Sequence, residues 1–358
     1  MARRIRKTFW PRAFQRNLEA MARTAMRAGT KAVTKAIRAA PSTKVPRAVH
    51  GAPRGARAMA PLPTLRKRAA QRSDPWITGI AMSAGGARRY RLYRPPGVRR
   101  TERLPLVVMM HGCGQDAEAL AVSTRMNRIA ARERFLVLYP EQDRLHNAQG
   151  CWNWYDTRTG HAQGEAGIID AAIDQVCNTQ PVDPSRIAMA GDSSGAGIAA
   201  LLATRRPERF KAVAMHSGIA PGVANSPATA LSAMHGRRAA PPLPADAAAL
   251  PALLVIQGSA DRIVAAENGA AAARLWAAHA DAHAVAPRQV QRGARYPATI
   301  TDYRTKDRRL AATLCIVEGL GHAWSGGAAG QRYSDPKGPD GSRMIWSFCA
   351  KQFATVRA

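Results

Sequence analysis

Residues 191–195 read Gly-Asp-Ser-Ser-Gly, which fits the pattern G-x-S-x-G with Ser193 at its centre. An apolar run, 187–190, leads into this pattern, and a run of small and apolar residues, 196–202, follows it. A strand, a tight turn and a helix in this order form a nucleophile elbow, in which small flanking residues let the turn expose the serine hydroxyl. We therefore expect Ser193 to be the nucleophile of an acyl-transfer reaction.

A serine hydroxyl is a weak nucleophile until a neighbouring base takes its proton. In proteins with such an elbow, an acidic residue and then a histidine follow the serine along the chain. Asp261 follows the apolar run 253–257, and His322 lies in a glycine-rich segment after the run 313–318. We predict His322 as the general base and Asp261 as the carboxylate that orients it. Asp246 is the rival acid, but it lies in an Ala/Pro-rich segment.

The negative charge of a tetrahedral intermediate needs hydrogen-bond donors that are fixed in advance. One donor is expected from the backbone of Ser194, the residue after the nucleophile, and another from a loop that follows an early strand. The apolar run 106–111 ends in a histidine, and Gly112, Cys113 and Gly114 follow it. We predict the Cys113 N–H as the second donor.

The elements that must position these residues begin at about residue 74. From there, apolar runs of strand length alternate with helix-length segments, as is typical of an α/β fold with a mostly parallel sheet and helices on both faces. Catalytic residues in such folds lie on loops at the carboxyl ends of strands. The expected strands are 88–93, 106–111, 135–140, 187–191, 212–217, 253–257 and 313–318, and the expected helices are 117–132, 164–178, 194–205, 265–280 and 341–353. Residues 221–250 are expected to be irregular, and 281–312 to form a hairpin or loop.

The first fifth of the chain differs in charge from the rest. Residues 1–73 contain 19 Lys and Arg and one acid, a net charge of 19 − 1 = +18 out of +29 for all 358 residues. We predict a basic segment at 1–40 with an amphipathic helix at 10–39, a flexible Pro/Ala/Arg-rich linker at 41–73, and an α/β catalytic domain at 74–358. No apolar run is long enough for a transmembrane helix, and we expect no metal site.

Six segments carry a family resemblance: HGCGQ, CWNWYD, GEAGIIDAAID, VDPSRIAMAGDSSGAGIAALLATRRPERFKAVAMHSG, QGSADRIV and GLGHAWSGG. Over about residues 80–353 they resemble the polyhydroxybutyrate-depolymerase-type esterases, a family that also contains acetylxylan and feruloyl esterases. The resemblance implies an α/β-hydrolase fold and a serine esterase without cofactor or metal. It places the nucleophile, acid, base and oxyanion loop on Ser193, Asp261, His322 and Cys113, and substrate contacts on Trp152, Trp154 and Trp324.

The same resemblance implies a substrate and a location. Secreted depolymerases carry a signal peptide and a polymer-adsorbing domain, which we do not find, so the chain resembles the short intracellular members that act on storage granules. We expect a cytoplasmic, granule-associated protein that hydrolyses poly- or oligo-3-hydroxybutyrate. One alternative is an esterase for feruloyl or acetyl esters. Another is a granule- or nucleic-acid-binding protein with an inactive hydrolase domain.

Two features leave alternatives open. Residues 10–39 are expected to bind the anionic lipid surface of a granule. A disordered, solvated tail is the second reading, and nucleic acid is less favoured because few aromatic residues lie among the charges. Cys113 and Cys151 lie in loops that border the expected site and are either bridged or free. Cys315 and Cys349 form a second possible pair.

Overall fold

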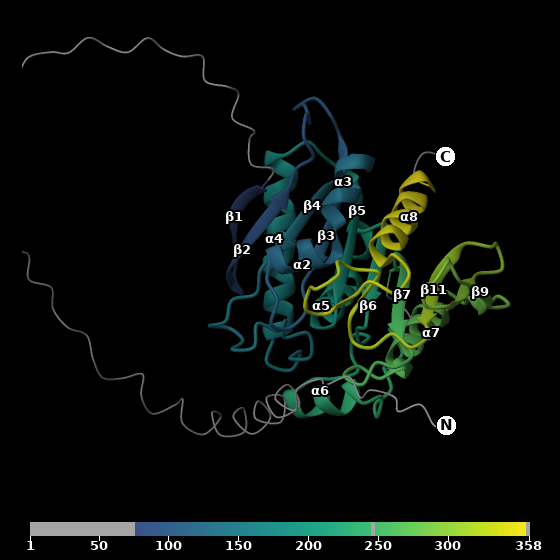
Figure 1. The fold of residues 1–358 in the computed structure, drawn as a ribbon. Coiled ribbons are helices and arrows are strands. Elements are labelled where there is room, and N and C mark those ends of the chain that lie inside the picture. The colour runs from purple at the N-terminus through teal and green to yellow at the C-terminus, as the bar shows by residue number, and fades with distance from the viewer. Residues whose placement is uncertain (1–75, 245–247, 356–358) are drawn as a thin grey trace, which may run out of the picture. The chain divides into compact units, whose positions relative to one another are not determined.

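The computed structural model describes residues 76–244 and 248–355. The expected basic helix and linker, 1–73, and the rival acid Asp246 lie outside the described residues. Eleven strands form one sheet in the order β1-β2-β4-β3-β5-β6-β7-β11-β10-β8, with β9 paired to β10 (Figure 1). The strands are β1 (Trp76–Ser83), β2 (Gly86–Tyr93), β3 (Leu104–Met110), β4 (Leu136–Pro140), β5 (Val182–Asp192), β6 (Ala212–His216), β7 (Ala252–Gly258), β8 (His283–Ala284), β9 (Arg288–Val290), β10 (Ala298–Arg304) and β11 (Leu310–Val317).

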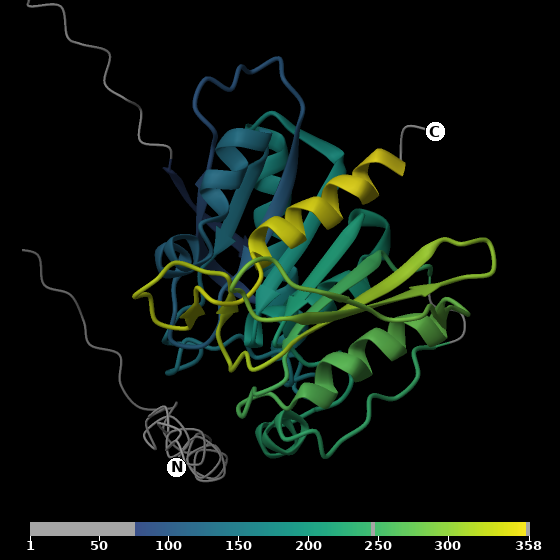
Figure 2. The same ribbon diagram turned by 45° about the vertical axis from the view of Figure 1, so that its right-hand side comes forward.

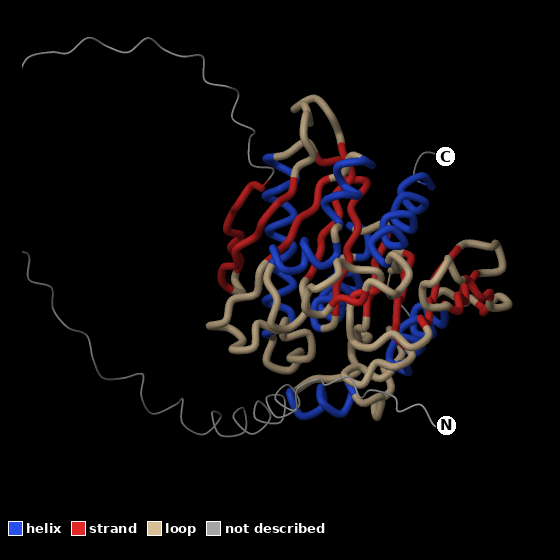
Figure 3. Tube along the Cα trace, viewed as in Figure 1, coloured by secondary structure: helices blue, strands red, loops and turns tan. Residues whose placement is uncertain are grey.

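The centre of the sheet is parallel and its edges are antiparallel. Strands β4, β3, β5, β6, β7 and β11 pair in parallel with their neighbours. The β1–β2, β2–β4 and β10–β11 pairs are antiparallel. The expectation of a mostly parallel sheet is therefore confirmed. Most of the longer loops lie at one end of this sheet (Figure 3).

Helices cover both faces because the central strands are apolar on both sides. In β3 all seven residues are buried, and alternate residues point into different cores. Leu106 and Val108 belong to the core under α4 (His161–Thr179), α5 (Ser194–Arg205) and α7 (Ala266–His279). Val107 and Met109 belong to the core under α2 (Ala117–Thr124), α3 (Met126–Glu133) and α8 (Gly341–Ala354). Helix α8 lies across that face of the sheet (Figure 2). The result is the α/β-hydrolase arrangement that the resemblance implied.

Two of the expected elements differ from the structure. The helix expected at 117–132 is broken at Arg125, which adopts a left-handed conformation with φ 55° and separates α2 from α3. The segment expected to be irregular, 221–250, contains α6 (Pro227–Met234), which begins with a capping box at Ser226 and a proline in its first turn. The segment 281–312 forms strands β8 to β10 at the sheet edge. Among the described residues, no helix is long and apolar enough to cross a membrane.

Candidate active site

The expected elbow lies between β5 and α5 at the centre of the sheet. Ser193 joins the two elements with φ 54° and ψ −119°, a backbone conformation that residues with a side chain rarely adopt. A Cβ atom on Gly191 would lie 2.3 Å from the backbone of Gly195, and one on Gly195 would lie 2.3 Å from the carbonyl oxygen of Met110. Only glycine fits either position, so the elbow is held in its strained form by close backbone packing.

The three side chains expected to act together are brought together. Nε2 of His322 lies 3.0 Å from Oγ of Ser193, and Nδ1 lies 2.8 Å from Oδ2 of Asp261. The backbone N–H groups of Ile263 and Val264 each donate to Oδ1 of Asp261 at 2.9 Å. The carboxylate is therefore fixed by its own loop and presents its other oxygen to the imidazole. This geometry suits proton transfer from the serine to His322.

The charges of this pair shift both pKa values. Burial alone lowers the pKa of His322, but the hydrogen bond and charge of Asp261, with the charge of Asp192, raise it above the ordinary value of 6.5. Burial alone raises the pKa of Asp261, but His322 and the N–H groups of its own loop lower it below 3.8. Asp261 therefore stays ionised while His322 gains and loses a proton.

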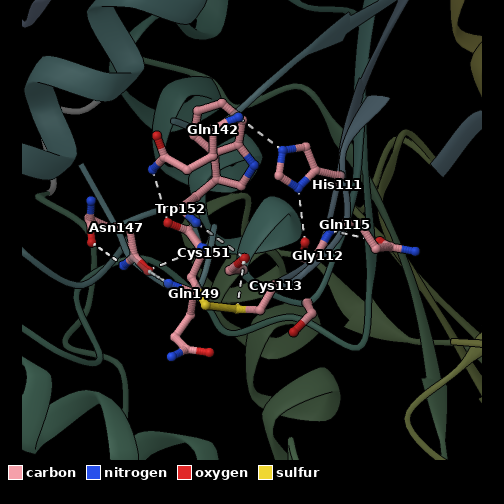
Figure 4. The surroundings of a disulfide bond; sticks show 12 residues. His111, Gly112, Cys113, Gln115, Gln142, Asn147, Gln149, Cys151 and Trp152 are labelled. Carbon is pink, nitrogen blue, oxygen red and sulfur yellow. Dashed lines mark hydrogen bonds between the residues drawn. A yellow bond between two sulfur atoms is a disulfide. The ribbon is translucent and has the colours of Figure 1, made fainter. Parts of the chain in front are cut away.

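The expected oxyanion donors lie next to each other. Cys113 follows β3, and Ser194 is the first residue of α5, where helix N–H groups have no partner within the helix. Cys113 forms a disulfide with Cys151, which settles the first open pairing (Figure 4). The hydroxyl of Ser194 lies 3.4 Å from Sγ of Cys113 and accepts a hydrogen bond of 3.3 Å from the Trp152 N–H. The side chain of Ser194 thus ties the elbow to the disulfide loop, which sequence reasoning did not foresee.

The other cysteines are free thiols. Cys315 and Cys349 are both buried and unbridged, and Cys177 is half-buried. Burial raises the pKa of Cys315 and of Cys349 to about 12, so both stay protonated near neutral pH.

The three tryptophans expected to contact substrate lie in the interior, with 0% exposure for Trp152, 9% for Trp154 and 1% for Trp324. Trp154 packs against Gly197 of α5, where an added Cβ would lie 2.9 Å from the ring. Nε1 of Trp324 donates to Oγ of Ser342 at 3.1 Å. These contacts leave little ring surface for an acyl chain, and a substrate contact by these residues stays a prediction.

His216, at the end of β6, joins the nucleophile to the loop of the base. Its carbonyl oxygen accepts from the Ser193 N–H at 2.9 Å, and its Nε2 accepts from the Ser325 N–H at 3.0 Å. The ring stacks on Trp324 at 4.8 Å, and Nδ1 lies 3.4 Å from Asp192. Sequence reasoning missed this residue. A histidine at the end of an apolar strand could have indicated it, since the carboxyl ends of parallel strands meet at one edge of the sheet.

Two acids of α4 are buried, although charged residues usually lie on the surface. Glu165 is 3% exposed and pairs with Arg88, and Asp170 is 8% exposed and pairs with Arg206 and Arg209. A carboxylate is buried only where donors compensate its desolvation, and both have them. Among the described residues, no group of three or more His, Cys, Asp or Glu side chains is arranged to hold a metal ion.

Comparison with known proteins gives one family match. The sequence model of the family described as "Esterase PHB depolymerase" matches residues 88–281, more than half of the 358 residues. This range includes Cys113, Ser193 and Asp261, and it ends before His322.

Three curated proteins resemble parts of the chain. Poly(3-hydroxyalkanoate) depolymerase C of Paucimonas lemoignei is 34% identical over 115 residues, which are 32% of this chain and 28% of that protein. Feruloyl esterase B of Neurospora crassa is 32% identical over 117 residues, 32% of this chain and 39% of that protein. Acetylxylan esterase of Coprinopsis cinerea is 30% identical over 141 residues, 38% and 37% of the two chains. The chain thus spans less than half the length of these relatives.

A solved structure supports the fold. Acetyl xylan esterase from Aspergillus awamori superimposes with a TM-score of 0.55 and 18% identity, over 69% of this chain and 94% of that chain. At this identity the likeness concerns the fold alone.

Proposed function

This chain belongs to the esterase PHB depolymerase family, and from that premise we propose that it is a serine esterase that hydrolyses poly- or oligo-3-hydroxybutyrate. One observation carries the proposal. The imidazole of His322 lies between Oγ of Ser193, at 3.0 Å, and Oδ2 of Asp261, at 2.8 Å. A base that touches a strained serine on one side and a buried carboxylate on the other is arranged for acyl transfer.

The reaction proceeds in two halves. His322 takes the proton of Ser193 as the serine oxygen attacks the ester carbonyl, and the N–H groups of Cys113 and Ser194 stabilise the oxyanion. The protonated His322 then gives its proton to the leaving alcohol oxygen as the acyl–oxygen bond breaks. Water, deprotonated by His322, then attacks the acyl-enzyme. His322 returns this proton to Oγ of Ser193 as the acyl–serine bond breaks and the acid leaves. These residues carry every proton transfer without a cofactor.

The polyester substrate is supported by the family and by the likeness to the depolymerase of Paucimonas lemoignei. Release of 3-hydroxybutyrate from amorphous granules by wild type and by Ser193→Ala is the direct test. We expect the variant to lose on the order of 10⁶-fold in turnover, because the remaining groups cannot form an acyl-enzyme. Equal release by both proteins would refute the proposed nucleophile.

A small ester is the second candidate substrate, favoured by the matches to feruloyl and acetylxylan esterases. Turnover of methyl ferulate or acetylated xylan without release of 3-hydroxybutyrate would establish it. Absence of any turnover, including that of p-nitrophenyl butyrate, would favour the third reading, a binding protein with an inactive hydrolase domain.

The N-terminal region 1–73 has a net charge of 19 − 1 = +18, and its residues 10–39 are proposed to hold the enzyme on the anionic surface of a granule. Deletion of 1–73 is then expected to preserve soluble-ester turnover and reduce granule degradation. Equal loss of both activities would contradict this role, and tight DNA binding by the segment alone would favour a nucleic-acid partner.

The proposed cytoplasmic, granule-associated location meets one opposing observation. Structural disulfides such as Cys113–Cys151 persist mainly in oxidising compartments. Alkylation of thiols in intact cells before lysis distinguishes the cytoplasm from an oxidising compartment. Modification of Cys113 and Cys151 would support the cytoplasm, and their protection as a disulfide would support an oxidising compartment.

A further inference from the structure

Glu165 is a buried carboxylate outside the Ser193–His322–Asp261 group, and Gln142 connects it to the loop of Cys151. Both oxygens of Glu165 on α4 are occupied by donors. Oε1 accepts from Nε2 of Gln142 at 2.6 Å, from Nδ2 of Asn153 at 2.7 Å and from Arg88 at 3.3 Å. Oε2 accepts from the Asn153 N–H at 2.8 Å. Gln142, Asn153 and Arg88 are themselves at least nine-tenths buried, so Glu165 is the acceptor at the centre of a closed polar network.

Gln142 connects this carboxylate to the loops of the site. Its Nε2 also donates to the carbonyl oxygen of Cys151 at 2.9 Å, and its Oε1 accepts from Nε of Arg88 at 2.7 Å and from the Asp143 N–H at 3.0 Å. Both donors and both lone pairs of this amide are therefore used. Figure 4 shows Gln142 between the ring of His111 and the backbone of Cys151 beside the disulfide.

The backbone of Gln142 holds the other side of the same loop. Its N–H donates to Nε2 of His111 at 3.0 Å, so the proton of this ring lies on Nδ1, which donates to the carbonyl oxygen of Gly112 at 2.9 Å (Figure 4). Burial lowers the pKa of His111 and keeps the ring neutral in this role. Cys113 is thus fixed from two directions, through His111 and Gly112 in the chain and through the disulfide to Cys151.

Resting on the proposed function, we propose that Glu165 is a positioning residue of the oxyanion hole, which acts on the Cys113 N–H through Gln142. A buried ion pair with its hydrogen bonds contributes little net stability compared with apolar packing, whereas it fixes geometry sharply when every member is satisfied. Here every contact of Glu165 leads to a residue that borders or supports the disulfide loop.

The isosteric variant Glu165→Gln tests the proposal. An amide presents an N–H₂ group where the carboxylate presents an acceptor, so in either orientation at least one donor of Gln142, Asn153 or Arg88 faces another donor. We expect kcat for p-nitrophenyl butyrate, per titrated active site, to fall about 10- to 100-fold with KM little changed, as for a donor displaced by a fraction of an ångström. Binding of an aryl trifluoromethyl ketone, whose adduct carries an oxyanion, is expected to weaken by a similar factor.

Asp170→Asn is the matched control, because Asp170 is a buried, arginine-paired carboxylate of the same helix whose partners, Arg206 and Arg209, do not contact the disulfide loop. It is expected to lower thermal stability without changing kcat or inhibitor binding. The acid limb of the pH profile, which reports His322, is expected to stay in place in both variants. If Glu165→Gln does not fold, Gln142→Met removes the same link. This variant is also expected to have a lower kcat with KM little changed.

The outcomes separate the two claims. A lower melting temperature in Glu165→Gln with unchanged kcat and inhibitor affinity would overturn the positioning role and leave the esterase proposal intact. No ester turnover by wild type would overturn the proposed function, and the positioning role with it.

Discussion

Nδ1 of His322 lies 2.8 Å from Oδ2 of Asp261, whose side chain has no solvent exposure. The carboxylate cannot turn to water, and the N–H groups of Ile263 and Val264 hold its other oxygen. His322 is therefore fixed in the tautomer whose Nε2 accepts the proton of Ser193. This contact fixes the orientation of the imidazole and raises its pKa against the lowering effect of burial.

The contact predicts how activity depends on pH. In the proposed mechanism His322 acts as a base only when neutral, and Asp261 raises its pKa above 6.5 against the lowering effect of burial. Activity is thus lost as pH falls through this raised pKa, and the acid limb of kcat/KM is expected to have its midpoint above 6.5. In Asp261→Asn the negative charge is gone, so the limb moves to lower pH, and kcat falls on the order of 10⁴-fold. A pH profile of p-nitrophenyl butyrate hydrolysis checks both, and an unmoved limb would exclude Asp261 as the partner.

Gly195 of the elbow is expected to tolerate no side chain. A Cβ there would lie 2.3 Å from the carbonyl oxygen of Met110 and 2.5 Å from that of His111. Neither carbonyl can move without displacing the end of β3 and the loop that follows it. Gly195→Ala is expected to cost about 3 kcal/mol or more of unfolding free energy. Gly167→Ala is the control, because its nearest neighbour is Oγ of Ser83 at 3.7 Å, and it should stabilise α4 by about 0.5–1 kcal/mol. Urea unfolding measures both, and equal effects would contradict the packing argument.

The disulfide predicts a thiol count. Of five cysteines, Cys177, Cys315 and Cys349 are free, so the denatured, unreduced protein should react with three equivalents of a thiol reagent, and with five after reduction. The bridge closes a loop of 38 residues' separation. Its loss in the double variant Cys113→Ala/Cys151→Ala is expected to lower the free energy of unfolding by about 4 kcal/mol, because the unfolded chain gains conformational entropy. Cys177→Ala should cost far less, and five reactive thiols before reduction would show that the bridge does not form.

The sequence alone was sufficient to find the residues that meet at the carboxyl ends of buried strands. Ser193, Asp261 and His322 each follow a continuous apolar run, and parallel strands bring such positions to one edge. The helix break at Arg125 was not predictable, because neither glycine nor proline marks it. The guanidinium of Arg125 donates to the carbonyl oxygen of Gly326, a contact between segments far apart in the sequence.

The polar support of the site was missed for a different reason. Glu165 stands three residues after Ala162 and four before Ile169, so the helical period places it on the buried face of α4. Charged residues are rarely buried unless they are paired, so the residue type alone points to the surface. Its partners Arg88 and Gln142 are 77 and 23 residues away in the chain, and only the folded sheet brings them within hydrogen-bond distance.

Substitution of Trp324 tests whether its ring belongs to the core or lines the substrate site. Its ring is 1% exposed, stacks on His216 and donates to Oγ of Ser342. Trp324→Phe removes the donor and part of the ring, so we expect a loss of about 1–3 kcal/mol of unfolding free energy. The ratio of kcat/KM for p-nitrophenyl butyrate and p-nitrophenyl octanoate should stay unchanged, because a buried ring does not contact the acyl chain. A changed ratio at normal stability would instead place Trp324 against the substrate, in agreement with the family resemblance.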